Sequence, residues 1–371
     1  MPQDRFWMEQ ALDLALKGWG RTRPNPLVGC VIIRDGKILA KGHHASLGEV
    51  HAERHAITQA RQRGIDLQGA SLYVNLEPCS HQGRTPPCTE IIIEAGIREV
   101  VLAMKDPNPL VAGRGIAALQ AAGIRVRSGV MEAEARKLNE IFIKYITTRT
   151  PFVLLKSAIS IDGKMATRTG DSKWISGPQA RVVVHQWRDR FAGIMVGSQT
   201  ILKDDPSLDT RLPEQIGRIG RNPLRIIVDS QGRIPFEARA LQGAGDPGVI
   251  LATTSRIGRD RQAAYEALGV QVLPLDAPDG RVDLSALVCE LGNRGIDSVM
   301  LEGGGTLNAA FLQAGLVDKL MLFMAPKLIG GMQAISCVAG QGAECLTQAI
   351  AIDRMSIRPC GDDWLIEGYP G

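Results

Sequence analysis

At 371 residues the chain exceeds the usual size of one hydrophobic core, so its length predicts two domains. Its 43 basic and 39 acidic residues are dispersed, and only 4% of residues are aromatic, which disfavours a nucleic-acid-binding surface. A formal net charge of +4 remains compatible with a small phosphorylated substrate.

The composition favours a protein of the reducing cytoplasm. The seven cysteines are widely spaced in a long chain, which disfavours a disulfide framework. The opening residues, "MPQDRFWMEQ", contain no apolar signal core, and no apolar run approaches the length of a membrane span. We therefore expect neither a membrane nor a nucleic acid as a partner.

The first half of the chain alternates helices and strands. Apolar residues recur at helical spacing from Asp4, which can cap a helix, up to Gly18. "VGCVIIRDGKILAKG" then places two apolar runs around Asp35 and Gly36, which predicts a β-hairpin. Strands that alternate with helices predict a sheet covered on both faces, and Pro151 marks the end of this half. Further helices are predicted over residues 51–63, 85–96, 115–123 and 131–149, and strands over 71–78, 98–104 and 124–130.

The second half is again of the α/β type. "FVLLKSAIS" predicts a buried strand, and a helix is predicted from Pro178 to Arg190. The run "KLMLFMAPKLIGG" fits a core strand or the interface of a homo-oligomer. Further strands are predicted over residues 192–197, 223–230, 248–254 and 297–305.

One group of residues has the pattern of a zinc deaminase. His51 stands at the start of a predicted helix with Glu53 two positions later, and Cys79 and Cys88 follow downstream. One imidazole and two thiolates provide three ligands of a tetrahedral Zn2+ and leave one position open, which is typical of catalytic zinc. The order H-x-E, then P-C and a second cysteine, is the signature of hydrolytic deaminases of amino-substituted rings, in which the glutamate moves protons.

The spacing of the two cysteines departs from the commonest form of this signature. Eight residues lie between Cys79 and Cys88, whereas nucleoside and nucleic-acid deaminases have P-C-x-x-C. The insert "SHQGRTPP" still delivers Cys88 to the first turn of the next helix, where proline is tolerated. Within the insert, His81 fits a loop or substrate contact better than a ligand. Arg84 fits a phosphate contact and a solvent-exposed arginine equally well.

Four segments resemble the deaminase domain of the bifunctional riboflavin-biosynthesis family: "RTRPNPLVGCVI", "GHHASLGEVHAE", "NLEPCSHQGRTPPC" and "DPNPLVAGRGI". That family combines diaminohydroxyphosphoribosylaminopyrimidine deaminase with 5-amino-6-(5-phosphoribosylamino)uracil reductase. The resemblance implies a cytidine-deaminase-like α/β/α domain over residues 1–148, with one Zn2+ per chain. It assigns the metal to His51, Cys79 and Cys88, catalysis to Glu53, substrate contacts to Asn25 and His44, and matching pocket motifs to Asp106 and Asn108.

The segment "LEGGGTLN" places three glycines between an apolar strand and a helix. Glycine lets the backbone approach a phosphate, and a helix N-terminus offers it N–H groups. The G-x-G-x-x-G fingerprint is absent, and a tight turn alone explains the glycines as well. Together with "LKSAISIDGKMATRTGDSKWISGPQAR" and "VGSQTILKDDPSLDTR", however, the segment resembles the reductase domain of the same family. This implies a dihydrofolate-reductase-like α/β domain over residues 151–371.

The second resemblance implies NADPH as a cofactor and reduction of a ribosyl group to ribityl. Arginines at two of the matching positions suit a phosphate, because guanidinium is permanently charged and forked. Lys156, on the first strand, is placed to abut the substrate. The implied cofactor contacts are Ala158, Trp174, Thr200, Asp204, Ser230, Gly303, Gly304 and Gly305, and the implied substrate contacts are Ser172, Arg188, Leu208, Arg211 and Glu302.

We therefore expect a zinc-dependent aminohydrolase joined to an NADPH-dependent oxidoreductase. It would deaminate 2,5-diamino-6-(5-phosphoribosylamino)pyrimidin-4(3H)-one and then form 5-amino-6-(5-phosphoribitylamino)uracil. The alternative is a nucleic-acid (tRNA-type) base deaminase with a non-catalytic C-terminal module, which the lack of a basic stripe and an aromatic platform disfavours. A structural zinc domain, or an inactive reductase half kept for assembly, is the non-enzymatic reading.

Overall fold

The structure is a computed structural model, and it describes residues 2–81, 86–109, 111–243 and 247–371. The chain divides into two compact units, Met1–Arg149 and Thr150–Gly371. Within the described residues, no helix combines the length and the apolar character that crossing a membrane would need.

The first unit is built on a five-stranded sheet with the order β2-β1-β3-β4-β5 among the described residues. β1 and β2 form the expected hairpin, and its turn residues Asp35 and Gly36 both have the positive φ angles, 51° and 70°, that such a turn requires. β3, β4 and β5 run parallel. The strands are β1 (Gly29–Arg34), β2 (Lys37–His43), β3 (Ser71–Leu76), β4 (Glu99–Met104) and β5 (Arg125–Arg127). The helices are α1 (Pro2–Ala15), η1 (Leu16–Gly18), α2 (Ala52–Gln62), α3 (Cys88–Glu94), α4 (Arg114–Ala121), α5 (Glu132–Leu138) and α6 (Glu140–Thr148).

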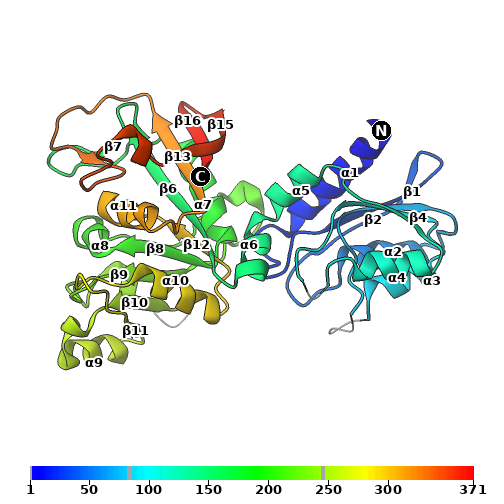
Figure 1. Cartoon of the computed structure of the whole chain (residues 1–371), viewed down its shortest axis with the longest axis horizontal. Coiled ribbons are helices and arrows are strands. Elements are labelled where there is room, and N and C mark those ends of the chain that lie inside the picture. The colour runs from blue at the N-terminus through cyan, green and yellow to red at the C-terminus, as the bar shows by residue number, and fades with distance from the viewer. Residues whose placement is uncertain (1, 82–85, 110, 244–246) are drawn as a thin grey trace. The chain divides into compact units, whose positions relative to one another are not determined.

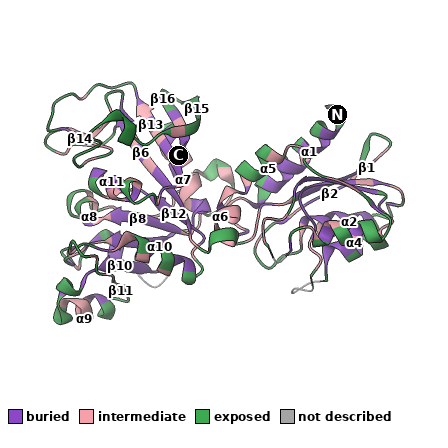
Figure 2. Cartoon of the chain, viewed as in Figure 1, coloured by how far each residue is buried: buried purple, intermediate pink, exposed green. Residues whose placement is uncertain are grey.

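Helices cover both faces of this sheet, as the alternating pattern predicted (Figure 1). Successive strand residues point to opposite faces. Leu72 and Leu102 therefore pack with α2, α3 and α4, whereas Tyr73 and Val101 pack with α1 and α5. Figure 2 shows the result, with buried strands lying between helices whose outer faces are exposed.

Two local predictions for this unit are wrong. Asp4 does not cap α1 but lies buried inside its first turn, where it accepts a hydrogen bond from Tyr73 Oη (2.8 Å) and pairs with Arg127 (2.8 Å). The helix expected over residues 131–149 is divided at Asn139. The buried Asn139 side chain bonds the N–H and the C=O of Leu27 (2.8 and 3.0 Å), and this anchoring holds its backbone away from helical geometry (φ −106°, ψ 20°).

The second unit contains a nine-stranded sheet with the order β11-β10-β9-β8-β12-β6-β13-β16-β15 and a two-stranded sheet, β14-β7, within the described ranges. β6 and α7 begin and end where the sequence predicted. The strands are β6 (Phe152–Ser160), β7 (Lys164–Ala166), β8 (Gly193–Gly197), β9 (Leu224–Val228), β10 (Val249–Thr253), β11 (Gln271–Pro274), β12 (Ser298–Leu301), β13 (Lys319–Ala325), β14 (Ile335–Ser336), β15 (Ile352–Cys360) and β16 (Asp363–Pro370). The helices are α7 (Pro178–Arg190), α8 (Ser198–Asp204), η2 (Glu214–Ile216), η3 (Arg239–Leu241), η4 (Ser255–Ile257), α9 (Arg259–Ala267), α10 (Leu284–Asn293), α11 (Gly305–Gln313) and η5 (Leu346–Gln348).

The five strands β10, β9, β8, β12 and β6 are parallel neighbours in this sheet. One face packs against α10 and α11 through Leu287 and Phe311, and the other against α8 and α9 through Ile201 and Tyr265. Because parallel strands end at the same edge of a sheet, their following loops meet there, and ligands of such sheets bind at that edge.

Candidate active sites

His51, Cys79 and Cys88 meet at one point in the first unit. His51 is the residue before α2, Cys79 follows β3, and Cys88 is the first residue of α3. The His51 Nδ1 atom lies 3.5 Å from Cys79 Sγ and 3.4 Å from Cys88 Sγ. The ligand atoms of all three residues lie within 4.8 Å of one another.

This geometry fits a tetrahedral zinc ion. With Zn–S bonds of about 2.3 Å and a Zn–N bond of about 2.0 Å, tetrahedral angles require N···S separations of about 3.5 Å. The two observed separations agree with that value. In the part of the chain that the structure describes, no fourth histidine, cysteine or carboxylate joins the cluster. His81 is exposed and lies outside it, and Arg84 falls outside the described residues.

Glu53 lies in the first turn of α2 with its carboxyl buried. Burial raises the pKa of Glu53 to about 7, and the neighbouring Cys79 adds to the rise. A carboxyl group with a pKa near neutrality can both accept and release a proton during a reaction. The mutual hydrogen bond of Cys79 and Cys88 lowers the pKa of the Cys79 thiol and, together with burial, raises the pKa of the Cys88 thiol, so Cys79 is the first of the two to become the thiolate that a metal needs.

Asn25 and His44 lie beside this cluster. The ring centroids of His44 and His51 are 5.6 Å apart, and Asn25 Nδ2 lies 3.2 Å from His44 Nε2. Burial lowers the pKa of His44, which favours the neutral form of its ring. A neutral ring satisfies both contacts if its Nδ1–H donates to Val50 O (3.2 Å) and its Nε2 accepts from Asn25. Asn108 N donates to Asp106 Oδ1 (2.9 Å) in the segment after β4, and burial raises the pKa of Asp106.

Two residues that the sequence analysis did not single out hold the segments that carry the cysteines. Arg54 Nη2 donates to Pro86 O (3.0 Å), just before Cys88. Glu77 is buried directly before Pro78 and Cys79. Its carboxylate accepts four backbone N–H bonds, from Asp106 (3.1 Å), Gly113 (3.0 Å), Gly115 (2.9 Å) and Ile116 (3.2 Å). The sequence signal that could have identified Glu77 was a glutamate at the end of a predicted buried strand, directly before Pro78 and Cys79.

In the second unit, a cavity of about 1290 Å³ lies along the carboxyl ends of the parallel strands. It brings together every residue that the resemblance assigned to the reductase. They are Ala158, Ser172, Trp174, Arg188, Thr200, Asp204, Leu208, Arg211, Ser230, Glu302, Gly303, Gly304 and Gly305.

Glu302 is the centre of an ion-pair network in this cavity. Arg188 Nε and Nη2 approach its two oxygens at 2.7 and 3.1 Å, and Lys156 Nζ lies 3.3 Å away. Although burial raises the pKa of Glu302, the charges of Arg188 and Lys156 outweigh that effect and hold it below its usual range. Arg188 also donates to Asp209 O (2.8 Å), so much of its guanidinium is already engaged within the protein.

Arg211 is the more available of the two arginines. Its side chain is 67% exposed, and its ion pair with Asp209 is long, at 3.4 Å. Its backbone N–H donates to Nδ1 of His185 (3.1 Å), which also lines the cavity. Burial and the charge of Arg188 lower the pKa of His185 to about 4, so this ring is neutral near pH 7.

The three glycines after β12 differ in the space that a side chain would have at each position. A Cβ atom at Gly303 would lie 2.9 Å from Asn308 Oδ1, and one at Gly305 would lie 2.3 Å from Ser336 O. The protein itself therefore excludes larger residues at these two positions. At Gly304 the nearest atom would be Thr200 Oγ1, at 3.8 Å, so there the chain leaves open space beside the N-terminus of α11. That space suits the close approach of a phosphate.

Comparisons with known proteins match each of the two units to a known domain. Residues 1–104 match the cytidine and deoxycytidylate deaminase zinc-binding region, and residues 151–366 match the RibD C-terminal domain. The chain is 44% identical to the riboflavin biosynthesis protein RibD of Actinobacillus pleuropneumoniae (98% of this chain, 94% of the relative). It is 42% identical to RibD of Escherichia coli strain K12 (97% of this chain, 98% of the relative).

Solved structures show the same likeness over the whole length. The crystal structure of a diaminohydroxyphosphoribosylaminopyrimidine deaminase/5-amino-6-(5-phosphoribosylamino)uracil reductase from Thermotoga maritima is 37% identical. It aligns with a TM-score of 0.86 over 100% of this chain and 99% of that one. Acinetobacter baumannii RibD gives the same identity, coverage and TM-score. The family and fold class expected from the sequence are thus confirmed, and the chain belongs to the bifunctional RibD deaminase/reductases of riboflavin biosynthesis.

Proposed function

We propose that residues 1–148 deaminate 2,5-diamino-6-(5-phosphoribosylamino)pyrimidin-4(3H)-one and that residues 151–371 reduce the deaminated product with NADPH. The final product would be 5-amino-6-(5-phosphoribitylamino)uracil. The observation that carries the proposal is the agreement of the His51, Cys79 and Cys88 spacing with tetrahedral zinc, beside the buried carboxyl of Glu53.

In the deamination, water enters and ammonia leaves the ring carbon that bears the amino group. His51, Cys79 and Cys88 would hold one Zn2+. The charge of the bound ion would lower the pKa of the attacking water. Glu53, with a pKa near 7, would carry both protons of the attacking water in turn, the first to a ring nitrogen and the second to the departing amine, which leaves as ammonia. Asn25 and the neutral His44 offer hydrogen bonds that orient the pyrimidine.

In the reduction, a hydride is added to C1′ of the ribosyl group, the bond between C1′ and the ring oxygen breaks, and that oxygen takes up a proton, so that ribosyl opens to ribityl. NADPH, when bound, supplies the hydride from C4 of its nicotinamide. The chain orients the two reactants. Glu302 fixes Lys156 and Arg188 at one end of the cavity, Arg211 is available for the substrate phosphate, and the space at Gly304 receives the cofactor pyrophosphate.

Mass spectrometry of the product with and without NADPH tests both halves. Without NADPH we expect replacement of one amino group by oxygen and release of ammonia. With NADPH we expect a further gain of two hydrogens. Ammonia release that does not depend on zinc would contradict the proposed deaminase. Deaminated substrate that gains no hydrogens in the presence of NADPH would contradict the proposed reductase.

A further inference from the structure

The segment of residues 207–211 lines the reductase cavity without forming a helix or a strand, and it carries Leu208 and Arg211. Leu208 is buried and has a positive φ of 56°, a strained backbone conformation for a residue with a branched side chain. Such a conformation persists where the surrounding contacts hold it in place. The side chains that hold this segment therefore decide where Leu208 and Arg211 lie in the cavity.

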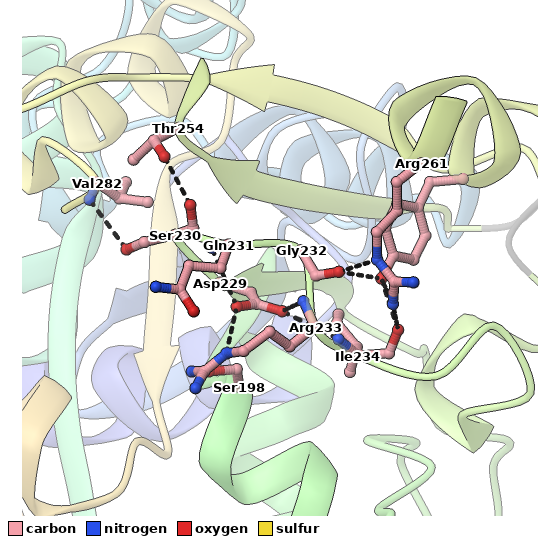
Figure 3. A network of polar contacts seen from close by, with 11 residues as sticks. Ser198, Asp229, Ser230, Gln231, Gly232, Arg233, Ile234, Thr254, Arg261 and Val282 are labelled. Atoms are coloured by element: carbon pink, nitrogen blue, oxygen red, sulfur yellow. Dashed lines mark hydrogen bonds and ion pairs between the residues drawn. The ribbon is translucent and has the colours of Figure 1, made fainter. Parts of the chain in front are cut away.

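Two side chains of α7 bind the backbone of this segment. Arg188 Nη1 donates to Asp209 O (2.8 Å), and His185 Nδ1 accepts from Arg211 N (3.1 Å). His185 and Arg188 stand three positions apart and both line the cavity, so one face of α7 holds the segment. The segment after β9 differs, because there the Asp229 carboxylate accepts from backbone N–H groups of its own loop (Figure 3).

The hydrogen bond from Arg211 N fixes the tautomer of the His185 ring. A ring nitrogen that accepts from an N–H group carries no proton, so the proton of the neutral ring lies on Nε2. The ring is neutral near pH 7, because burial and the charge of Arg188 lower its pKa. The charged groups that face it are Arg188, Arg211, Glu302 and Asp209.

The Nε2–H group of His185 remains available to a ligand. Within the described ranges of the chain, no protein group accepts a hydrogen bond from it. His185 is half-buried and lines the cavity together with Arg188 and Arg211. A donor that is partly removed from water and has no acceptor is unfavourable, and the oxygen of an anionic ligand would satisfy it. A neutral ring also adds a donor without the repulsion that a third positive charge would bring.

We propose that His185 is a further substrate-binding residue of the reductase, which also positions Arg211. Its Nδ1 holds the backbone of Arg211 against α7, and its Nε2–H donates to the phosphate of the substrate. This inference rests on the proposed reductase function and adds to it the residue that fixes Arg211 in place relative to Arg188.

Steady-state kinetics of the full-length chain with deaminated substrate and NADPH test the proposal. His185→Leu has neither the acceptor nor the donor, whereas His185→Gln keeps both. We expect His185→Leu to raise the KM for the substrate about tenfold, the effect of losing one charge-assisted hydrogen bond, with kcat and the KM for NADPH changed less than about twofold. His185→Gln should return the substrate KM to near the wild-type value. Gln179→Leu, at an exposed residue of α7 outside the cavity, is the matched control and should change none of these constants.

NMR of the wild-type chain with isotope-labelled histidine nitrogens gives a readout that depends on no substitution. The His185 ring is identified by its absence from the spectrum of His185→Gln. We expect this ring to be the Nε2–H tautomer near neutral pH, and its Nε2 resonance to shift when deaminated substrate is added.

Three outcomes would overturn the role of His185. They are an unchanged substrate KM in a His185→Leu chain that circular dichroism shows to be folded, a substrate KM in His185→Gln as high as in His185→Leu, and an Nε2 resonance that the substrate does not shift in an active chain. A wild-type chain that does not oxidise NADPH with deaminated substrate would instead overturn the proposed reductase function itself.

Discussion

Replacement of Glu77 by glutamine tests whether a buried carboxylate holds the deaminase loops in position. Both oxygens of Glu77 accept two backbone N–H bonds each. Glutamine keeps one oxygen but turns an NH2 group toward the other pair of N–H donors. Two hydrogen bonds are lost, and their donors, which lie in buried or part-buried positions, are left without an acceptor. Each unsatisfied donor costs about 1–3 kcal/mol, so Glu77→Gln should lower the free energy of unfolding of the first unit by about 2–6 kcal/mol.

The assay is urea unfolding of the full chain. Hydrogen exchange of peptides from residues 1–149 reports on the first unit, and the zinc content of each variant is measured in parallel. We expect one pair of amides to exchange faster, either Asp106 and Gly113 or Gly115 and Ile116, according to which oxygen the NH2 group replaces. Zinc content and deamination should fall, because Cys79 follows Glu77 by two residues. Glu94→Gln removes an exposed pair with Arg61 (3.4 Å) and should cost below about 1 kcal/mol. If Glu77→Gln unfolded at the same midpoint urea concentration as Glu94→Gln, the stabilising role of the Glu77 carboxylate would be refuted.

Three further predictions address the two sites. Glu53→Gln should keep about one zinc per chain by metal analysis but lose ammonia release, and full deamination would remove Glu53 from its proton-transfer role. Arg211→Ala should raise the reductase KM about tenfold or more and leave deamination intact; unchanged reductase kinetics would place the phosphate elsewhere. The pKa of His185 is lowered to about 4 on folding, so its contribution to stability is present above about pH 6.5 and lost as pH falls toward 4. His185→Gln should therefore flatten the thermal stability of the second unit across that range, and an unaltered slope would contradict this.

Local patterns in the sequence correctly predicted those features of the structure that depend on neighbouring residues. The run 152–160 is apolar enough to be buried on both faces, and it forms β6 with the predicted bounds. The Asp35-Gly36 turn and the first-turn position of Cys88 likewise follow from nearby residues. β15 was missed because its residues are almost all exposed, so no apolar alternation marks it.

The amino-acid sequence by itself determined which groups the chain has for its chemistry: an imidazole, two thiols and a carboxyl in the order of a deaminase, and glycines between a strand and a helix. Tertiary structure alone decided that Glu302 meets Lys156 across 146 residues and that Asn139 divides a helix by binding Leu27, 112 residues away. It also turned Asp229 toward the backbone N–H groups of its own loop. The physical reason is that hydrophobic periodicity reports only which face of an element is buried, whereas ion pairs and buried hydrogen bonds depend on which elements pack together.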